Sequence, residues 1–204
     1  MSNVIDWIYK NLTDTEKEEL IHKLKNRTDD IKLADIENGD IFKVGDYEFI
    51  KFSDDNGITT AVAKDIVFES DFGDNSNFAE SEVLRRMKDK FLPKITAIVG
   101  AENLRSIVTD LTTFDGLKTY GETESYISIP TLDFYRTNIA IFDKYKLDGW
   151  WWTATAWSAL PHYESASILC VSPSGGLNYY GYNNDYGVRP FLRFVSSIFV
   201  SRVS

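Results

Sequence analysis

The chain has 204 residues, 43% of them hydrophobic and 14% aromatic, which is enough to build one folded domain with a small appendage. Its formal net charge of −9 argues against nucleic acid or an anionic membrane as a partner, because phosphate binding needs clustered lysine and arginine. The single cysteine, Cys170, excludes an internal disulfide and is compatible with a reducing compartment.

The beginning of the chain carries no sign of export. Residues 1–7, MSNVIDW, lack the positively charged and apolar regions of a secretion signal. No apolar run reaches about 18 residues, the length of a membrane span. We therefore expect no membrane span, and a location in the cytoplasm of the producing cell or on a virion that is assembled there.

Residues 1–28 are predicted to form a short pair of helices, because apolar residues recur at helical spacing in two runs. The sequence TDTE at residues 13–16 fits a capping box, in which Thr13 caps the second helix and Glu16 reaches back. The pair is too small to bury a core alone. We expect it to pack on a second copy of the chain, on a partner protein or on the main domain.

The main domain is predicted at residues 38–195. It opens with a three-stranded meander over residues 41–64, because the pairs GD at 45–46 and NG at 56–57 are tight-turn sequences between strand-like runs. A helix is predicted over residues 78–92, where apolar side chains recur at helical spacing.

This helix is expected to end near Pro93. Residues 127–129 are predicted as a short strand, and a helical turn is expected to begin at Thr131. The last third of the domain holds three candidate strands with long polar connections, and residues 196–204 are expected to form a tail. The three strands are Trp150–Trp152, Ile168–Val171 and Val188–Phe194.

Two motifs in the last third have a structural interpretation. In a strand, Trp150 and Trp152 share one face and Trp151 takes the other, which predicts a central strand with core on both sides; a sugar-stacking surface is the alternative. Arg189 is expected to fork onto backbone carbonyls or a carboxylate. Pro190 cannot donate to a sheet, which predicts an edge strand or the start of one.

The chain offers little for catalysis or metal binding. Its two histidines, His22 and His162, have no neighbours at zinc-ligand spacing, and no Ser-His-acid set is evident. Asp71, Asp74 and Asn75 lack the spacing of a calcium loop, so we expect an acidic loop in which Asn or Ser caps the next helix. We therefore expect no enzyme, no metal and no cofactor.

Two C-terminal segments carry a family resemblance. Residues 149–158, GWWWTATAWS, and residues 167–194, SILCVSPSGGLNYYGYNNDYGVRPFLRF, resemble a bacterial and phage family of unknown function with a C-type-lectin-like fold. Its pattern is a Trp-Trp block, an Asn/Tyr-rich stretch and a Gly-Val-Arg-Pro ending. The sequence IPTLDFYRTN at residues 129–138 matches the segment that precedes the Trp block in such proteins.

The resemblance implies an α+β fold: a C-type-lectin-like domain with small twisted antiparallel sheets, two helices and long irregular loops, preceded by the N-terminal helical pair. The same fold carries the variable proteins of diversity-generating retroelements and is similar to formylglycine-generating enzymes. Formylglycine chemistry needs paired cysteines, whereas this chain has only Cys170. The sugar-binding motifs of calcium-dependent lectins are also absent from the sequence.

Residues 178–187 use only Asn, Tyr, Gly and Asp. Tyrosine offers a large contact area with few rotatable bonds, and Asn and Gly add adaptable hydrogen bonds, as in antibody paratopes. All four residue types are reachable from the AAY codons that retroelement systems mutagenise. Two interpretations stay open: a ligand-contact surface, or an irregular loop whose polar groups satisfy each other.

The first functional hypothesis is a non-enzymatic ligand-binding module of a phage, prophage or mobile element, which presents a Tyr/Asn-rich surface to a protein or glycan. The candidate ligand-binding residues are Trp157, His162, Tyr163, Asn178, Tyr180, Tyr182, Asn183, Asn184, Asp185 and Tyr186. The alternative is an intracellular acidic inhibitor or regulator carried by a mobile element, such as an anti-defence protein, whose acidic runs would occupy a basic nucleic-acid groove.

Overall fold

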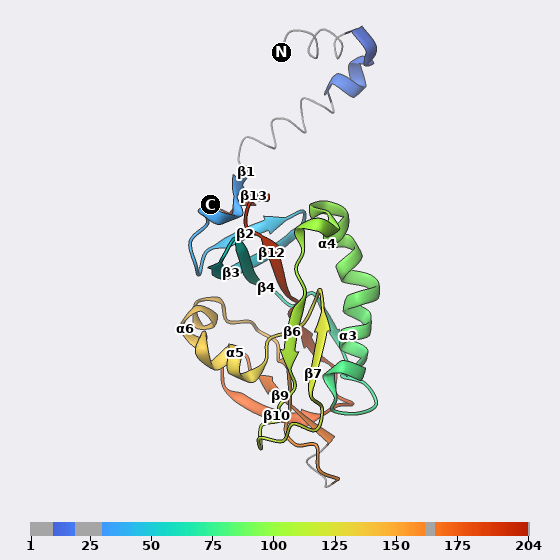
Figure 1. Ribbon diagram of the computed structural model, residues 1–204, viewed down its shortest axis with the longest axis vertical. Coiled ribbons are helices and arrows are strands. Elements are labelled where there is room, and N and C mark those ends of the chain that lie inside the picture. Colours follow the sequence, from blue (N-terminus) through green and yellow to red (C-terminus); the bar gives the residue numbers. More distant parts are fainter. Residues whose placement is uncertain (1–9, 19–29, 162–165, 204) are drawn as a thin grey trace.

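The structure is a computed structural model that describes residues 10–18, 30–161 and 166–203. Within these ranges, thirteen strands form three sheets, and short helices flank them (Figure 1). The predicted α+β class is confirmed. No helix in the described ranges is both long and apolar enough to cross a bilayer.

The largest sheet has six strands, and every neighbouring pair in it is antiparallel. Its order is β1 (Asp30–Lys32), β13 (Phe199–Arg202), β2 (Ile41–Val44), β3 (Tyr47–Asp55), β4 (Ile58–Ala63) and β12 (Phe191–Val195). The predicted meander is confirmed as β2–β3–β4. Gly45, Asn56 and Gly57 take the positive φ angles that tight hairpin turns require. Because β1 pairs with β13, the sheet spans residues 30–202 and includes part of the expected tail.

The second sheet has five strands in the order β10 (Leu177–Gly181), β9 (Ser167–Val171), β8 (Trp151–Ala156), β11 (Tyr186–Val188) and β5 (Phe68–Ser70). Its pairs are antiparallel except β8–β11, which run parallel with Gly187 opposite Trp151. The chain leaves the β9–β10 hairpin, crosses a turn at 182–185 and re-enters the sheet on the other side of β8. A third, two-stranded sheet joins β6 (Ile107–Asp110) to β7 (Glu122–Ser125).

Two helical segments cover the sheets. The first runs through η2 (Phe78–Glu80), α3 (Glu82–Arg86), the π-helical turn η3 (Met87–Phe91) and α4 (Leu92–Val99), and the second comprises α5 (Leu132–Thr137) and α6 (Ile139–Phe142). The predicted helix end near Pro93 is wrong, because the helix continues to Val99. Pro93 lies in the first turn of α4, where its missing N–H is not needed. The π-helical turn just before it pairs the N–H of Leu92 with the carbonyl of Met87.

The core lies on both faces of the six-stranded sheet. Phe49 and Ala61 point into the larger hydrophobic cluster, which α3, η3 and α4 complete. Ile50 and Val62, one residue further along each strand, point into the smaller cluster with α5 and α6. Figure 1 shows α3–α4 and α5–α6 on opposite sides of the molecule.

The tryptophan block occupies β8, the middle strand of its sheet. Trp152 is buried in the larger cluster, where its indole N–H donates to the carbonyl of Ser70 at 2.9 Å. Trp151 is buried in the smaller cluster and stacks on Phe142, with ring centroids 5.6 Å apart. The predicted core on both sides of this strand is confirmed.

Arg189 is buried between the two larger sheets and contacts both of them. The side chain is 1% exposed, and its Nε and Nη2 donate to the carbonyls of Ala63 (3.0 Å) and Lys64 (2.9 Å). Its guanidinium lies over the Trp151 ring. Burial lowers the pKa of Arg189 to about 10. The predicted fork onto backbone carbonyls is confirmed, and Pro190 directly precedes β12, an edge strand, as expected.

The capping box near the N-terminus is confirmed. The Thr13 N–H donates to Glu16 Oε2 at 2.7 Å, and the Glu16 N–H donates to Thr13 Oγ1 at 3.3 Å. The N–H and the hydroxyl of Thr13 both donate to the Glu16 carboxylate, which lowers the pKa of Glu16. Most of the predicted helical pair over residues 1–28 lies outside the described residues, so its packing stays a prediction.

Candidate functional site

The Tyr/Asn-rich segment forms β10, a turn and β11. Strand β10 lies at the edge of the five-stranded sheet, so one of its backbone edges has no partner strand among the described residues. Backbone hydrogen bonds hold the turn at 182–185 in place. The Tyr182 N–H donates to the Ala166 carbonyl, and the Tyr182 carbonyl accepts the Phe72 N–H. Of the predicted ligand-binding residues, His162 and Tyr163 lie outside the described part of the chain.

Three predicted ligand-binding tyrosines, Tyr180, Tyr182 and Tyr186, are half-buried against the larger core cluster. Tyr180 meets the ring of Trp150 at 5.2 Å and that of Tyr186 at 5.4 Å. Tyr186 also packs on Trp152 at 4.7 Å, and burial raises its pKa. These rings therefore hold the segment on the sheet.

The amides and the carboxylate of the segment behave differently. Asn178, Asn183 and Asp185 are exposed. Asn184 is half-buried, and its side chain donates to the carbonyl of Gly181 at 2.9 Å, which shapes the turn. Asn178 shares the strand face of Tyr180, so the outward polar side of the segment is formed by the turn residues Asn183 and Asp185.

A row of aromatic rings lies on the other face of β10. Tyr179 packs on Trp157 with centroids 4.2 Å apart, and Trp157 packs on Phe114 at 4.8 Å. Phe114 is 47% exposed and Tyr179 is 37% exposed. We call Phe114, Trp157 and Tyr179 the aromatic row; Leu177, exposed on the same strand face, extends it.

Sequence reasoning found Trp157 but missed Tyr179 and Phe114. Strand alternation separates Tyr179 from Tyr180, because adjacent residues of β10 point to opposite faces. That signal was available in the sequence once β10 was assigned. Phe114 is brought in by the backbone, since its N–H donates to the carbonyl of Ala156 at 2.9 Å. Nothing local in the sequence marks this contact.

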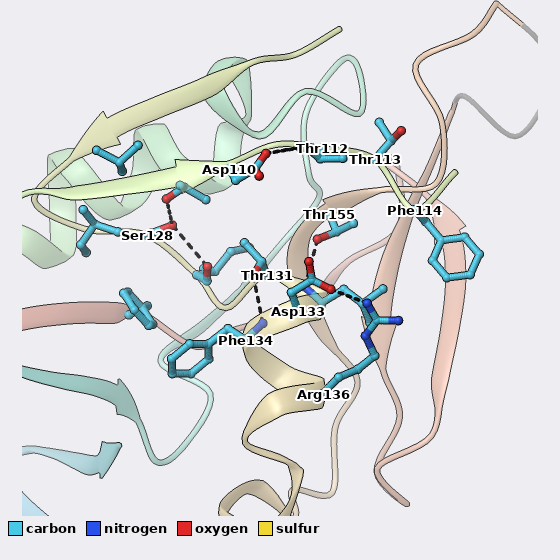
Figure 2. Close-up of a pocket in the computed structure, with 16 residues that line it drawn as sticks. Asp110, Thr112, Thr113, Phe114, Ser128, Thr131, Asp133, Phe134, Arg136 and Thr155 are labelled. Carbon is cyan, nitrogen blue, oxygen red and sulfur yellow. Dashed lines mark hydrogen bonds and ion pairs between the residues drawn. The ribbon is translucent and has the colours of Figure 1, made fainter. Parts of the chain in front are cut away.

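A cleft of about 460 Å³ adjoins the aromatic row, and Phe114 belongs to both (Figure 2). Its walls come from β6 and the loop that follows, from residues 128–136 around the start of α5, and from Thr155 of β8. The helical turn predicted to begin at Thr131 is confirmed as α5; Thr131 is its N-cap, and its hydroxyl accepts the Phe134 N–H at 3.2 Å. Asp133 and Arg136 form an exposed ion pair at the rim.

The acidic loop contains helix caps, as expected. The Asn77 side chain accepts the N–H of Ala79, and the Ser81 hydroxyl accepts that of Leu84. Asp71 and Asp74 line an open depression together with Arg85 and other charged side chains. Over the described ranges, no three His, Cys, Asp or Glu side chains are grouped so as to hold a metal ion.

Cys170 is expected to be unreactive in the native protein. It is fully buried in β9, and burial raises the pKa of its thiol from about 9 to about 12. Between these values the folded state binds more protons than the unfolded state, so this contribution to stability is present below pH 9 and is lost as the pH rises. At pH 8, Ellman's reagent should label Cys170 only after unfolding in urea; full-rate labelling of the native protein would contradict its burial.

Fold and site together define an α+β protein with a surface row of aromatic rings beside a polar cleft. Comparison of the chain with protein-family models, curated proteins and solved structures gives no match.

Proposed function

We propose that the chain is a non-enzymatic ligand-binding module whose contact surface is the aromatic row together with the outward polar side of residues 178–185. The observation that carries the proposal is the row itself. Three rings from three chain segments pack on one another in tilted contacts at the surface, and the two outer rings stay more than a third exposed.

Such a row suits recognition on physical grounds. Aromatic side chains dominate the energy of most contact surfaces, and rings that are already packed on one another lose little side-chain entropy when a ligand covers them. Asn183 and Asp185 lie exposed in the turn that follows β10 and supply hydrogen-bonding groups for orientation. The inward tyrosines hold this segment in place, so that the contact residues are presented by a stable sheet.

We further propose that this frame is the C-type-lectin-like fold of the phage and bacterial family that the C-terminal segments resemble. Support comes from the small sheets, the two helical segments and the long connections, as between β6 and β7. The proposed origin in a phage, prophage or mobile element rests on the same resemblance.

The proposal is tested by comparing the wild-type protein with Tyr179→Ala and Trp157→Ala in a screen of immobilised glycans, surface proteins and whole bacterial cells. We expect each variant to bind at least tenfold more weakly to any hit, because each removes a ring from the row. Phe199→Ala is the matched control: Phe199 is 64% exposed, but lies on β13, at the far end of the molecule from β10 (Figure 1).

The control variant should bind like the wild type. Equal binding by the wild type, Tyr179→Ala and Trp157→Ala, all shown to be folded by circular dichroism, would remove the aromatic row from the contact surface.

A further inference from the structure

We infer that the cleft beside the aromatic row binds a neutral saccharide. This inference names a ligand class and rests on the proposed function, because Phe114 lines the cleft and also belongs to the row. The cleft volume of 460 Å³ falls within the range of about 300–1,000 Å³ that is usual for small-molecule sites.

The cleft is unusually rich in hydroxyl side chains. Six of the residues that line it carry one: Thr109, Thr112, Thr113, Ser128, Thr131 and Thr155. A saccharide needs both donors and acceptors at close spacing, and a hydroxyl supplies either. Thr109, Ser128 and Thr112 already hydrogen-bond within the protein, whereas Thr131 and Thr155 only accept a backbone N–H each.

Two of these hydroxyl oxygens accept a backbone N–H, which leaves their own protons to donate. Thr155 is 5% exposed, and its oxygen accepts the Leu132 N–H at 3.0 Å. Thr131 likewise accepts the Phe134 N–H. Neither hydroxyl has an acceptor for its own proton within the described part of the chain. Each hydroxyl can therefore donate a hydrogen bond to a ligand, and Thr155 is more than nine-tenths buried.

Asp110, an exposed residue that also lines the cleft, supplies an acceptor. Asp110 Oδ1 receives both the N–H and the hydroxyl of Thr112, at 2.8 and 2.6 Å, which leaves Oδ2 without a partner among the described residues. The same hydrogen bonds lower the pKa of Asp110, so the group is a carboxylate at neutral pH. A carboxylate oxygen accepts two sugar hydroxyls without needing a proton of its own.

Aromatic rings close the two ends of the cleft. Figure 2 shows Phe134 at one end and Phe114 at the other, with Thr131, Asp133 and Thr155 between them. The rings offer apolar surface to the C–H faces of a sugar, while the polar groups between them meet its hydroxyls. Such a division into apolar and polar surface matches a saccharide better than a peptide backbone or a lipid chain.

The negative charge of the cleft favours neutral saccharides over anionic ones. The charged residues that line the cleft are Asp110, Asp133 and Arg136, so its formal charge is −1, and the whole chain carries −9. Arg136 is already paired with Asp133. An anionic ligand, such as a phosphate or a sialylated sugar, would therefore meet repulsion from the cleft and from the protein as a whole.

The test is saturation-transfer NMR and calorimetry with a panel of neutral mono- and disaccharides built on glucose, galactose, mannose and N-acetylhexosamines. The wild type should bind at least one, Thr155→Val and Asp110→Asn should weaken that binding at least tenfold, and Thr155→Ser should retain it. Thr60→Val, a half-buried threonine on β4, is the matched control and should bind like the wild type.

Each outcome decides a separate point. Binding of N-acetylneuraminic acid in preference to neutral sugars would overturn the charge argument, and unchanged binding by Thr155→Val would place the sugar elsewhere. If no saccharide binds but Tyr179→Ala still abolishes binding to a protein or cell-surface ligand, the inference fails while the proposed function stands. If the row variants also bind normally, both fail.

Discussion

Replacing Trp152 with alanine is expected to lower the free energy of unfolding by about 4 kcal/mol, as is typical for removal of a fully buried tryptophan. The ring fills the larger core cluster beside Phe72 and Tyr186, so its loss leaves a cavity between the sheet and the helices. It also leaves the carbonyl of Ser70 without its indole donor. Because Tyr186 packs directly on Trp152, the turn at 182–185 should loosen as well.

Urea denaturation followed by far-UV circular dichroism measures this effect. Trp157→Ala is the matched control, because Trp157 is half-buried in the surface row and its removal opens no enclosed cavity. That variant should lose about 1 kcal/mol. Equal stability losses for Trp152→Ala and Trp157→Ala would contradict the placement of Trp152 in the core and of Trp157 at the surface.

Replacing Arg189 with alanine should cost about 3 kcal/mol, because two buried carbonyls lose a charged donor and a cavity opens beside Trp151. Arg189→Lys keeps the charge but cannot fork onto the carbonyls of Ala63 and Lys64 at once. The free energy of unfolding of Arg189→Lys should lie between those of the wild type and of Arg189→Ala. Both variants are measured by the same urea titration.

The control for this series is Arg202→Ala, since Arg202 is exposed near the end of β13. Its stability should stay within about 0.5 kcal/mol of the wild type. A stable Arg189→Ala variant would contradict the role assigned to Arg189 in joining the sheets.

Elements with strong local signals were predictable from the sequence. The meander followed from two turn pairs that contain the positive-φ residues Gly45, Asn56 and Gly57, and the helix start at Thr131, also predicted, has the Thr131 hydroxyl as its cap. The alternation of Trp151 and Trp152 between two clusters followed from strand geometry alone. In each case the deciding interaction lies within a few residues.

Elements that depend on distant partners were missed. The π-helical turn that carries the helix past Pro93 is set by packing, and no local pattern marks it. Strand β5 was not predicted, and it forms because β11 pairs with it. The parallel pairing of β11 with β8 depends on where the turn at 182–185 sends the chain. The sequence of this turn does not indicate which strand the chain pairs with next.

The same distinction applies to the site. Composition singled out residues 178–186, but it could not tell which rings face outward. Tyr180 packs inward on Trp150, whereas its neighbour Tyr179 reaches Trp157 on the other face. The cleft assembles β6, the start of α5 and Thr155, segments that meet only in the folded chain.

A ligand that contacts the aromatic row should change the surroundings of the Trp157 indole. The most direct measurement is a two-dimensional NMR spectrum of the tryptophan indole N–H groups, recorded with and without a ligand found in the binding screen. The account predicts that the Trp157 signal shifts on binding while those of Trp151 and Trp152 stay in place, because these two are buried in the core. An unchanged Trp157 signal in the presence of saturating ligand would contradict it.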